Sequence, residues 1–525
     1  MQSRCLLFLL LGPALLAGSA CGRSLTDPSR TEAPDLQSHE MIVLGDKLED
    51  PYSVDNVTRA LDALYPTKAG RPLLEPTDYY VRFLPANETE YARLTATGID
   101  LTDHPLDHRI VRDGDYYHDP SLPGDAITWQ YAVVPLDFRF PEGIRSEILD
   151  RCYIAEHDVR TRADGIDWEA VEREAFRLTG NADLLPPQTK AAGGRPQGRI
   201  TIVDEAANGG QAFGVAGVRV LCHSFVKFSG TYTDRDGYYE MPKTYSSTVR
   251  YRLMFQNRKG FALGLNLVLV PASVSALGKG PAEGLDVGIT AVSDRKLFAR
   301  CAVNNAVYDY YERCAEEDLD LPRPPTNLRI WLFRNLTESG TWMLRQGTLL
   351  DSELLRKYLG PYASLVSVFL PDITLGLKGR DTYADIYFAA AHEMAHATHF
   401  MQAGKAYWSR YVLYVATSWV RTGRRYGDGS SADAGCCEVA EMWAYHLQNR
   451  LFADRYGGVM PVDGSDYWFC PQIFRYLGER GLAPSELFRA LRADVRDGES
   501  LQRRLTELYP DRAVQIRQAF DRYAR

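Results

Sequence analysis

The pattern of hydrophobic and polar positions changes about half-way along the chain. Between residues 79 and 255, short runs rich in β-branched and aromatic residues alternate with turns rich in glycine, proline and aspartate, which predicts strands. From residue 293 onward, apolar residues recur every three or four positions, which predicts helices. The strand-like runs are 79–83, 129–134, 199–203, 218–222, 230–233, 238–241, 249–255 and 328–333, and the helical segments are 297–316, 352–359, 382–403, 407–422 and 435–454. We therefore expect a multidomain α+β protein with a mostly helical C-terminal domain.

Three folded units follow from this pattern. They are a small mixed N-terminal domain at 71–190, a β-sandwich at 197–275 and a mostly helical domain at 290–525, with the glycine-rich stretch 191–196 as a linker. In the first unit, the irregular spacing of His104, His108 and His118 on expected loops predicts surface histidines.

Two motifs characterise the expected sandwich. The sequences GVRV at 217–220 and TDRDGYY at 233–239 resemble the carboxypeptidase regulatory-like family, and this resemblance implies a small β-sandwich module. Within the second motif, Gly237 is expected to be the left-handed residue of a hairpin turn.

The first twenty residues have the pattern of an export signal. Arg4 precedes an apolar run at 6–16, and small residues at 17–20 lead directly to Cys21. Cys21 in this context resembles the acylated cysteine of bacterial lipoproteins; ordinary secretion with cleavage before it is the alternative. We expect residues 1–20 to be a signal peptide and residues 21–70 a lipid-anchored tether. No later apolar run is long enough to cross a bilayer, so the expected location is the cell envelope, at the outer membrane or cell surface, with the lipid as the only anchor.

Composition and charge exclude other classes. Hydrophobic residues make up 45% of the chain and charged residues 24%, which is ordinary for globular proteins. The 60 basic and 68 acidic side chains give a net charge of −8 without long runs, so we expect no nucleic-acid partner. The nine cysteines are too few and too irregularly spaced for a disulfide-stapled scaffold.

The helical segment 382–403 contains the motif H-E-x-x-H. His392 and His396 are four residues apart, so on a helix they lie on one face and can bind the same metal ion. Glu393 lies at the neighbouring edge, where it can take a proton from a water that the metal activates. The motif therefore predicts a catalytic site with one Zn²⁺ per chain.

A third histidine follows on the same helix, which is expected to begin at a Thr382 cap and to end at Gly404. The metzincin pattern needs a glycine three residues after His396 and a histidine six residues after it, and this chain has His399 and glutamine there. That class is excluded. His399 lies roughly 10 Å along the helix axis from His392, so we expect it to support the metal ligands or line the cleft rather than to bind the ion.

Catalytic zinc needs a third protein ligand, and the segment 435–454 offers the carboxylates Glu438 and Glu441. Between residues 391 and 445 the chain resembles the gluzincin metallopeptidases, whose third ligand is a glutamate in an E-x-x-A context on a second helix. The sequence EMWA at 441–444 matches that context. The resemblance therefore implies Glu441 as the third ligand and Glu438 as a supporting residue. More broadly, the chain resembles exported lipoproteins of Bacteroides-type bacteria that carry a zincin domain.

Four further residues near Glu441 are candidates for chemistry. Tyr445 and His446 can each stabilise an oxyanion or simply pack in the core. Cys436 and Cys437 can be soft metal ligands, but no second cysteine pair accompanies them, so we expect buried helix residues.

These observations favour a zinc-dependent metallopeptidase of the cell envelope that acts on peptide or protein substrates. A surface binding or assembly lipoprotein with a metal-stabilised helical domain and no turnover is the alternative. An enzyme that cleaves another amide or a glycan would use the same zinc site.

Overall fold

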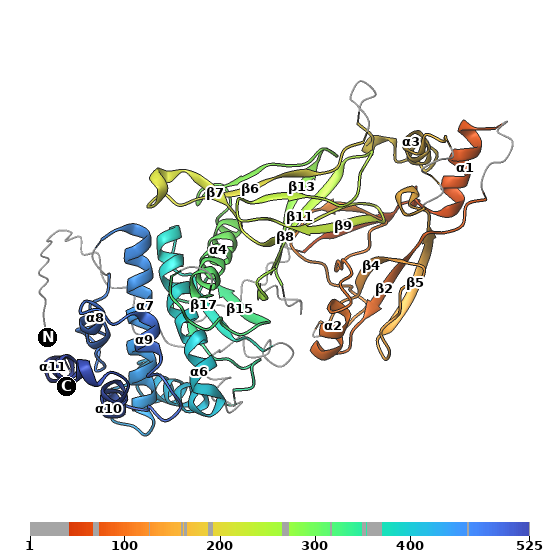
Figure 1. The fold of residues 1–525 in the computed structure, drawn as a ribbon. Coiled ribbons are helices and arrows are strands. Elements are labelled where there is room, and N and C mark those ends of the chain that lie inside the picture. Colours follow the sequence, from red (N-terminus) through yellow and green to blue (C-terminus); the bar gives the residue numbers. More distant parts are fainter. Residues whose placement is uncertain are drawn as a thin grey trace, which may run out of the picture.

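Figure 1 shows a computed structural model of the chain, in which the C-terminal helices gather at one end, the N-terminal strands at the other, and long strands lie between them. The structure describes residues 41–523, apart from 67–72, 125, 159–160, 162–164, 187–192, 265–271, 316–317, 349–352, 354–369 and 459–460. The expected signal peptide, Cys21 and the first part of the tether lie outside these residues, as does almost all of the helix expected at 352–359. The protein is mixed α+β with a mostly helical C-terminal region, as predicted.

The N-terminal unit is built around a three-stranded antiparallel sheet with β2 at its centre. Its strands are β2 (Asp78–Leu84), β4 (Gln130–Pro135) and β5 (Arg145–Cys152), and its helices are α1 (Val54–Leu64), α2 (Glu88–Thr95) and α3 (Trp168–Leu178). His104 is fully buried in this unit, so the prediction of a surface histidine is wrong for it. Its Nδ1 lies 2.8 Å from the Thr102 hydroxyl.

The expected tether of residues 21–70 is wrong over residues 41–66, which are folded. β1 (Val43–Lys47) pairs with β3 (His108–Arg112), and α1 follows directly. Val57, Ala60 and Leu61 are spaced as one helical face and are buried against α3. The tether was predicted from the polar composition of this segment, which does not reveal a short amphipathic helix.

Two sheets form the middle of the molecule, and their buried side chains belong to one hydrophobic core. The smaller sheet has the order β10-β6-β14, with β7 also paired to β6: β6 (Gln197–Val203), β7 (Ala212–Gly214), β10 (Tyr238–Glu240) and β14 (Val287–Ile289). The larger sheet includes β8 (Val218–Ser224), β9 (Lys227–Tyr232), β11 (Val249–Asn257), β12 (Phe261–Leu263) and β13 (Val274–Gly280). Gly237 has φ 76°, which confirms the predicted left-handed residue. The hairpin predicted there is wrong, because β9 pairs with β8 in the larger sheet and β10 pairs with β6 in the smaller one.

The larger sheet continues into the C-terminal region. β12 pairs in parallel with β15 (Leu328–Phe333), which pairs with β17 (Ile373–Gly376), and β16 (Gly340–Thr341) forms the edge. The ranges expected to be separate sandwich and C-terminal domains thus share an eight-stranded sheet. A parallel pairing between residues this far apart leaves no local signal in the sequence.

Helices pack beside β15 and β17 to complete the C-terminal region (Figure 1). They are α4 (Arg295–Ala315), α6 (Tyr383–Thr422), α7 (Ala434–Tyr456), α8 (Gln472–Gly478), α9 (Pro484–Phe488), α10 (Gly498–Leu508) and α11 (Ala513–Tyr523). The Thr382 hydroxyl accepts a hydrogen bond from the Asp385 amide at the start of α6, which confirms the predicted cap. Gly404, at φ 78° and ψ 175°, bends α6 where the first helix was expected to end. None of the helices described is both long and apolar enough to span a membrane.

Small side chains let α6 and α7 approach closely. Ala395 on α6 and Ala440 and Ala444 on α7 are all fully buried. The Trp443 indole of α7 donates a hydrogen bond of 3.2 Å to the Ala395 carbonyl of α6, which fixes the two helices against each other. This contact also brings together the polar side chains of α6 and α7 that lie between the two helices.

Candidate metal centre

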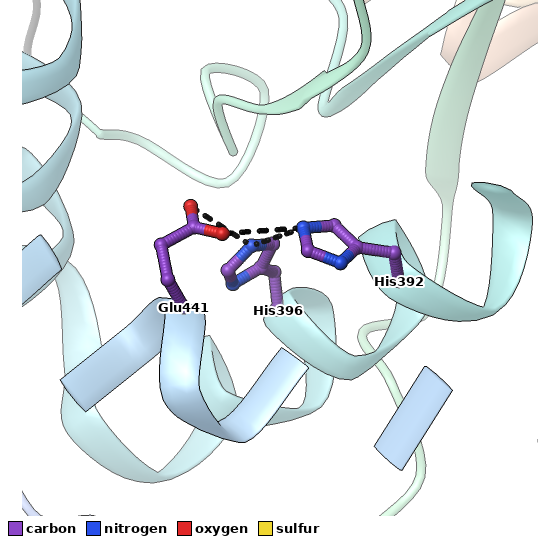
Figure 2. A group of neighbouring side chains, drawn as sticks. All are labelled: His392, His396 and Glu441. Atoms are coloured by element: carbon purple, nitrogen blue, oxygen red, sulfur yellow. Dashed lines mark hydrogen bonds and ion pairs between the residues drawn. The ribbon is translucent and has the colours of Figure 1, made fainter. Parts of the chain in front are cut away.

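Three buried side chains from α6 and α7 converge on one point (Figure 2). The Nε2 atoms of His392 and His396 lie 3.2 Å apart. The carboxylate oxygens of Glu441 lie 3.3 Å from His392 Nε2 and 3.4 Å from His396 Nε2. Sequence spacing placed the two histidines on one helical face, and the α6–α7 contact adds the carboxylate.

The distances are compatible with a shared metal ion. Nitrogen and oxygen ligands at 2.0–2.1 Å in a tetrahedron are about 3.3–3.4 Å from one another. The observed separations of 3.2–3.4 Å are close to this value, with Glu441 Oε2 nearer to His392 and Oε1 nearer to His396. Glu441 Oε2 is buried and has no hydrogen-bond partner among the described residues, so it is available as a ligand atom. Two imidazoles and a carboxylate are a donor set that suits zinc.

Burial makes this group costly without a cation. Glu441 and His396 are fully buried and His392 is 5% exposed. Burial lowers the pKa of His396, which favours the neutral imidazole that a metal needs. Burial alone would raise the pKa of Glu441, but the two histidines outweigh it and hold that pKa well below its ordinary value. A fully buried carboxylate requires positive charge nearby, and a bound cation would add to the charge that Arg425 supplies here.

Two further side chains orient the ligands. Tyr411 on α6 donates a hydrogen bond of 2.7 Å to Glu441 Oε1, and burial with the neighbouring carboxylate raises the pKa of Tyr411 well above its ordinary value, so the phenol stays protonated. Gln448 Oε1 lies 3.0 Å from His392 Nδ1. Since an amide oxygen only accepts, Nδ1 carries the proton and Nε2 keeps its lone pair for a metal.

Glu393 lies beside the cluster and is 2% exposed. The Thr341 hydroxyl of β16 donates a hydrogen bond of 2.7 Å to its Oε2. Its other oxygen, Oε1, lies 3.6 Å from Nη2 of Arg425. The carboxylate is thus held in place at one oxygen and faces a guanidinium at the other.

Arg425 enters the centre from the connection between α6 and α7. The connection turns at Gly423, Gly427 and Gly429, all with positive φ, and a Cβ at Gly429 would lie 2.7 Å from Trp468. Burial alone would lower the pKa of Arg425, but Tyr426, Glu393 and Glu441 raise it well above its ordinary value. The guanidinium is therefore a permanent buried charge beside two carboxylates.

Tyr445 and His446 occupy different surroundings. The Tyr445 ring packs on His392, with centroids 4.7 Å apart, and its hydroxyl lies 2.9 Å from that of Tyr467. His446 packs against Phe474 on the side of α8, where burial lowers its pKa to about 4. Tyr445 therefore contacts a candidate ligand and His446 belongs to the packing between α7 and α8.

Glu438 and His399, the two residues expected to support the metal ligands, make their contacts elsewhere. Glu438 Oε2 accepts a hydrogen bond of 2.9 Å from the Gly498 amide at the start of α10. His399 packs between Tyr407 and Trp408 with no hydrogen-bond partner in the described part of the chain, and burial lowers its pKa to about 3. Cys436 and Cys437 are buried and free, like the other cysteines in the structure.

Sequence reasoning missed Thr341, Tyr411, Arg425 and Gln448. Only Gln448 left a usable signal, because it lies seven residues after Glu441, two turns along the same face of α7. Thr341 and Arg425 come from short connections whose positions depend on the tertiary fold. No known protein family, no curated protein and no solved structure matches this chain.

Proposed function

We propose that the protein is a zinc-dependent metallopeptidase. The observation that carries the proposal is the close grouping of His392, His396 and Glu441, 3.2–3.4 Å apart, with Glu393 directly beside them. A purely structural zinc site is closed by four protein ligands, whereas a catalytic site has three and keeps one position open. Within the part of the chain that the structure describes, these three potential ligands alone come together at this position.

Each residue has a role in peptide hydrolysis under this proposal. A zinc ion held by the three ligands would supply Lewis-acid chemistry and make water nucleophilic at neutral pH. Glu393 takes a proton from the attacking water and delivers it to the leaving amine. Thr341 holds Glu393 Oε2 and so orients Oε1 for that transfer. Arg425 lies 3.6 Å from Oε1 and can balance the charge of this carboxylate.

The architecture and location belong to the same proposal. The helical C-terminal region would be a gluzincin-like catalytic domain, and the strands at 197–275 a carboxypeptidase regulatory-like module. Cys21 would carry the lipid that holds the exported chain at the cell envelope, where peptides or proteins are the substrates. Glu441 fits the gluzincin context at 441–444, which supports this assignment.

A non-catalytic binding protein with a metal-stabilised domain is the second candidate. It is favoured by one observation: both oxygens of Glu393 face protein groups, Thr341 and Arg425, and the side chain is 2% exposed. A carboxylate in this setting can serve to balance buried charge rather than to move protons.

The Glu393→Gln variant separates the two candidates. It keeps the size of the side chain and can still accept the Thr341 hydrogen bond, but it cannot take up a proton. Wild type and variant are purified in parallel, their bound metal is quantified, and both are incubated with a diverse peptide library that is analysed by mass spectrometry. The proposal predicts equal zinc in both and cleavage by the wild type alone. Equal zinc without cleavage by either favours the binding protein, and equal cleavage by both removes Glu393 from the reaction.

A further inference from the structure

Three neighbouring strands of the larger sheet place basic residues directly opposite one another. Arg250 of β11 pairs with His223 of β8 on one side and with Lys279 of β13 on the other. Residues directly opposite in an antiparallel sheet project from the same face, and like charges in such positions destabilise the sheet. The charges of Arg250 and Lys279 therefore favour a negative group over this part of the sheet, where the three strands lie side by side (Figure 1).

The row lines a cavity of about 320 Å³ between the sheet and the N-terminal unit. Arg109 of β3 lines the same cavity from the opposite side. The remaining wall is largely apolar and includes Leu106, Leu184 and Phe225. The cavity thus has a cationic side and an apolar side, which suits a ligand with a charged head and an apolar body.

His223 completes the row at the wall of the cavity. The residue is 7% exposed and lines the cavity, and both of its ring nitrogens are shielded from solvent. Burial and the charges of His104, Arg252 and Arg250 lower its pKa well below the ordinary value, and a hydrogen bond with the Phe225 backbone offsets only part of this. The imidazole is therefore uncharged, and a ligand in the cavity would lie near its ring without bonding to its nitrogens.

The charges around the cavity do not balance. Asp113 is shared between Arg250, at 2.6 Å, and Arg252, at 2.9 Å. Asp183 lies near Lys279, and His108 in the cavity wall is paired with Asp107. The cavity wall itself carries three cations (Arg109, Arg250 and Lys279) and one carboxylate (Asp183), whereas Arg252 and Asp113 do not line the cavity. The excess of about two positive charges matches a phosphate monoester, which carries −1.5 to −2 at neutral pH.

We infer that this cavity binds a small phosphate monoester with an apolar body. The phosphate oxygens accept hydrogen bonds from Arg250 and Lys279, with Arg109 closing the site from β3, and the apolar body lies against Leu106, Leu184 and Phe225. Arginine and lysine are the usual phosphate-binding side chains, and these three donors can contact different oxygens of one phosphate. The site is independent of the metal centre on α6 and α7.

Calorimetric titration with phenyl phosphate tests the inference, with inorganic phosphate and benzoate as probes that lack the apolar body or the phosphate. At low salt, phenyl phosphate is expected to bind one site per chain more tightly than either probe. The double variant Arg109→Gln/Lys279→Gln, whose two residues are exposed on the surface, is expected to bind at least about tenfold more weakly. Lys378→Gln removes an exposed positive charge from the C-terminal region and is expected to bind like the wild type.

Proton NMR of the histidines provides a second measurement on the folded wild type. Phenyl phosphate should shift the ring signals of His223, identified by their loss in His223→Gln, and should raise its pKa. Absence of saturable binding, equal affinity in the double variant, or a His223 signal that does not respond would each overturn the inference. Tighter binding of benzoate than of phenyl phosphate would overturn the assignment to phosphate monoesters.

Discussion

Removing one hydroxyl group next to Glu441 should weaken metal binding without disturbing the fold. Tyr411 is 2% exposed and donates a hydrogen bond of 2.7 Å to Glu441 Oε1, a fully buried carboxylate oxygen. Tyr411→Phe deletes this donor and keeps the ring. Hydrogen bonds to charged groups contribute about 1.5–3 kcal/mol, and losing partners that orient metal ligands typically weakens metal binding about 10–100-fold. We therefore expect zinc affinity to fall by about 10–100-fold.

Tyr407→Phe is the matched control, because Tyr407 lies one turn earlier on α6 and is equally buried. Its hydroxyl donates a hydrogen bond of 2.9 Å to the Cys436 carbonyl rather than to a carboxylate. Both variants lose one buried hydrogen bond, so in the metal-free protein the unfolding free energy should fall by about 0.5–1.5 kcal/mol in Tyr407→Phe and by about 1.5–3 kcal/mol in Tyr411→Phe.

Zinc affinity is measured by competition with a chelator of known strength, on wild type and both variants. The reasoning requires a loss in Tyr411→Phe alone. An unchanged affinity in that variant, or an equal loss in the control, would refute the claim that the Tyr411 hydroxyl orients Glu441.

Three other predictions concern stability. Burial raises the pKa of Asp50 from 3.8 to about 8, so between these pH values the folded protein holds one proton more than the unfolded chain, and the unfolding free energy should fall by about 1.4 kcal/mol per pH unit as the pH rises from 4 to 8. Asp50→Asn should remove this pH dependence. Equal pH dependence of wild type and variant in urea denaturation would contradict the prediction. Trp443→Ala should cost about 3–5 kcal/mol in the same assay, because it leaves a cavity between α6 and α7 and removes the hydrogen bond to the Ala395 carbonyl. A loss below about 1 kcal/mol would mean that the helices repack. Arg425→Met should destabilise the metal-free protein by about 3–5 kcal/mol, since it leaves Glu393 without its buried partner, and a stabilised variant in thermal unfolding would show that the pair is dispensable.

Local patterns predicted the elements that carry the candidate centre. The four-residue spacing of His392 and His396 predicts a shared face on any helix, and the Thr382 cap and Gly404 mark where that helix begins and bends. Glu441 was preferred over Glu438 from its sequence context, and the structure places Glu441 at the histidines and Glu438 at α10.

The parts that escaped prediction depend on contacts between distant segments. Arg425 reaches Glu393 through a glycine-rich connection whose course is set by packing against Trp468. The parallel pairing of β12 with β15 joins two ranges that composition had separated. His104 is buried and its ring lies 5.6 Å from that of His223 in the larger sheet, whereas its sequence neighbours suggested a surface position. Hydrophobic periodicity carries no information on such pairings.

The most direct test of the metal centre compares zinc content in two variants of α7. Glu441→Gln removes the carboxylate that lies 3.3–3.4 Å from both histidines, and Glu438→Gln removes the carboxylate one turn away that binds the Gly498 amide. Both proteins and the wild type are loaded with zinc, dialysed and analysed for metal per chain. We predict about one zinc in the wild type and in Glu438→Gln and almost none in Glu441→Gln. Full zinc in Glu441→Gln, or no zinc in the wild type, would contradict the proposed centre.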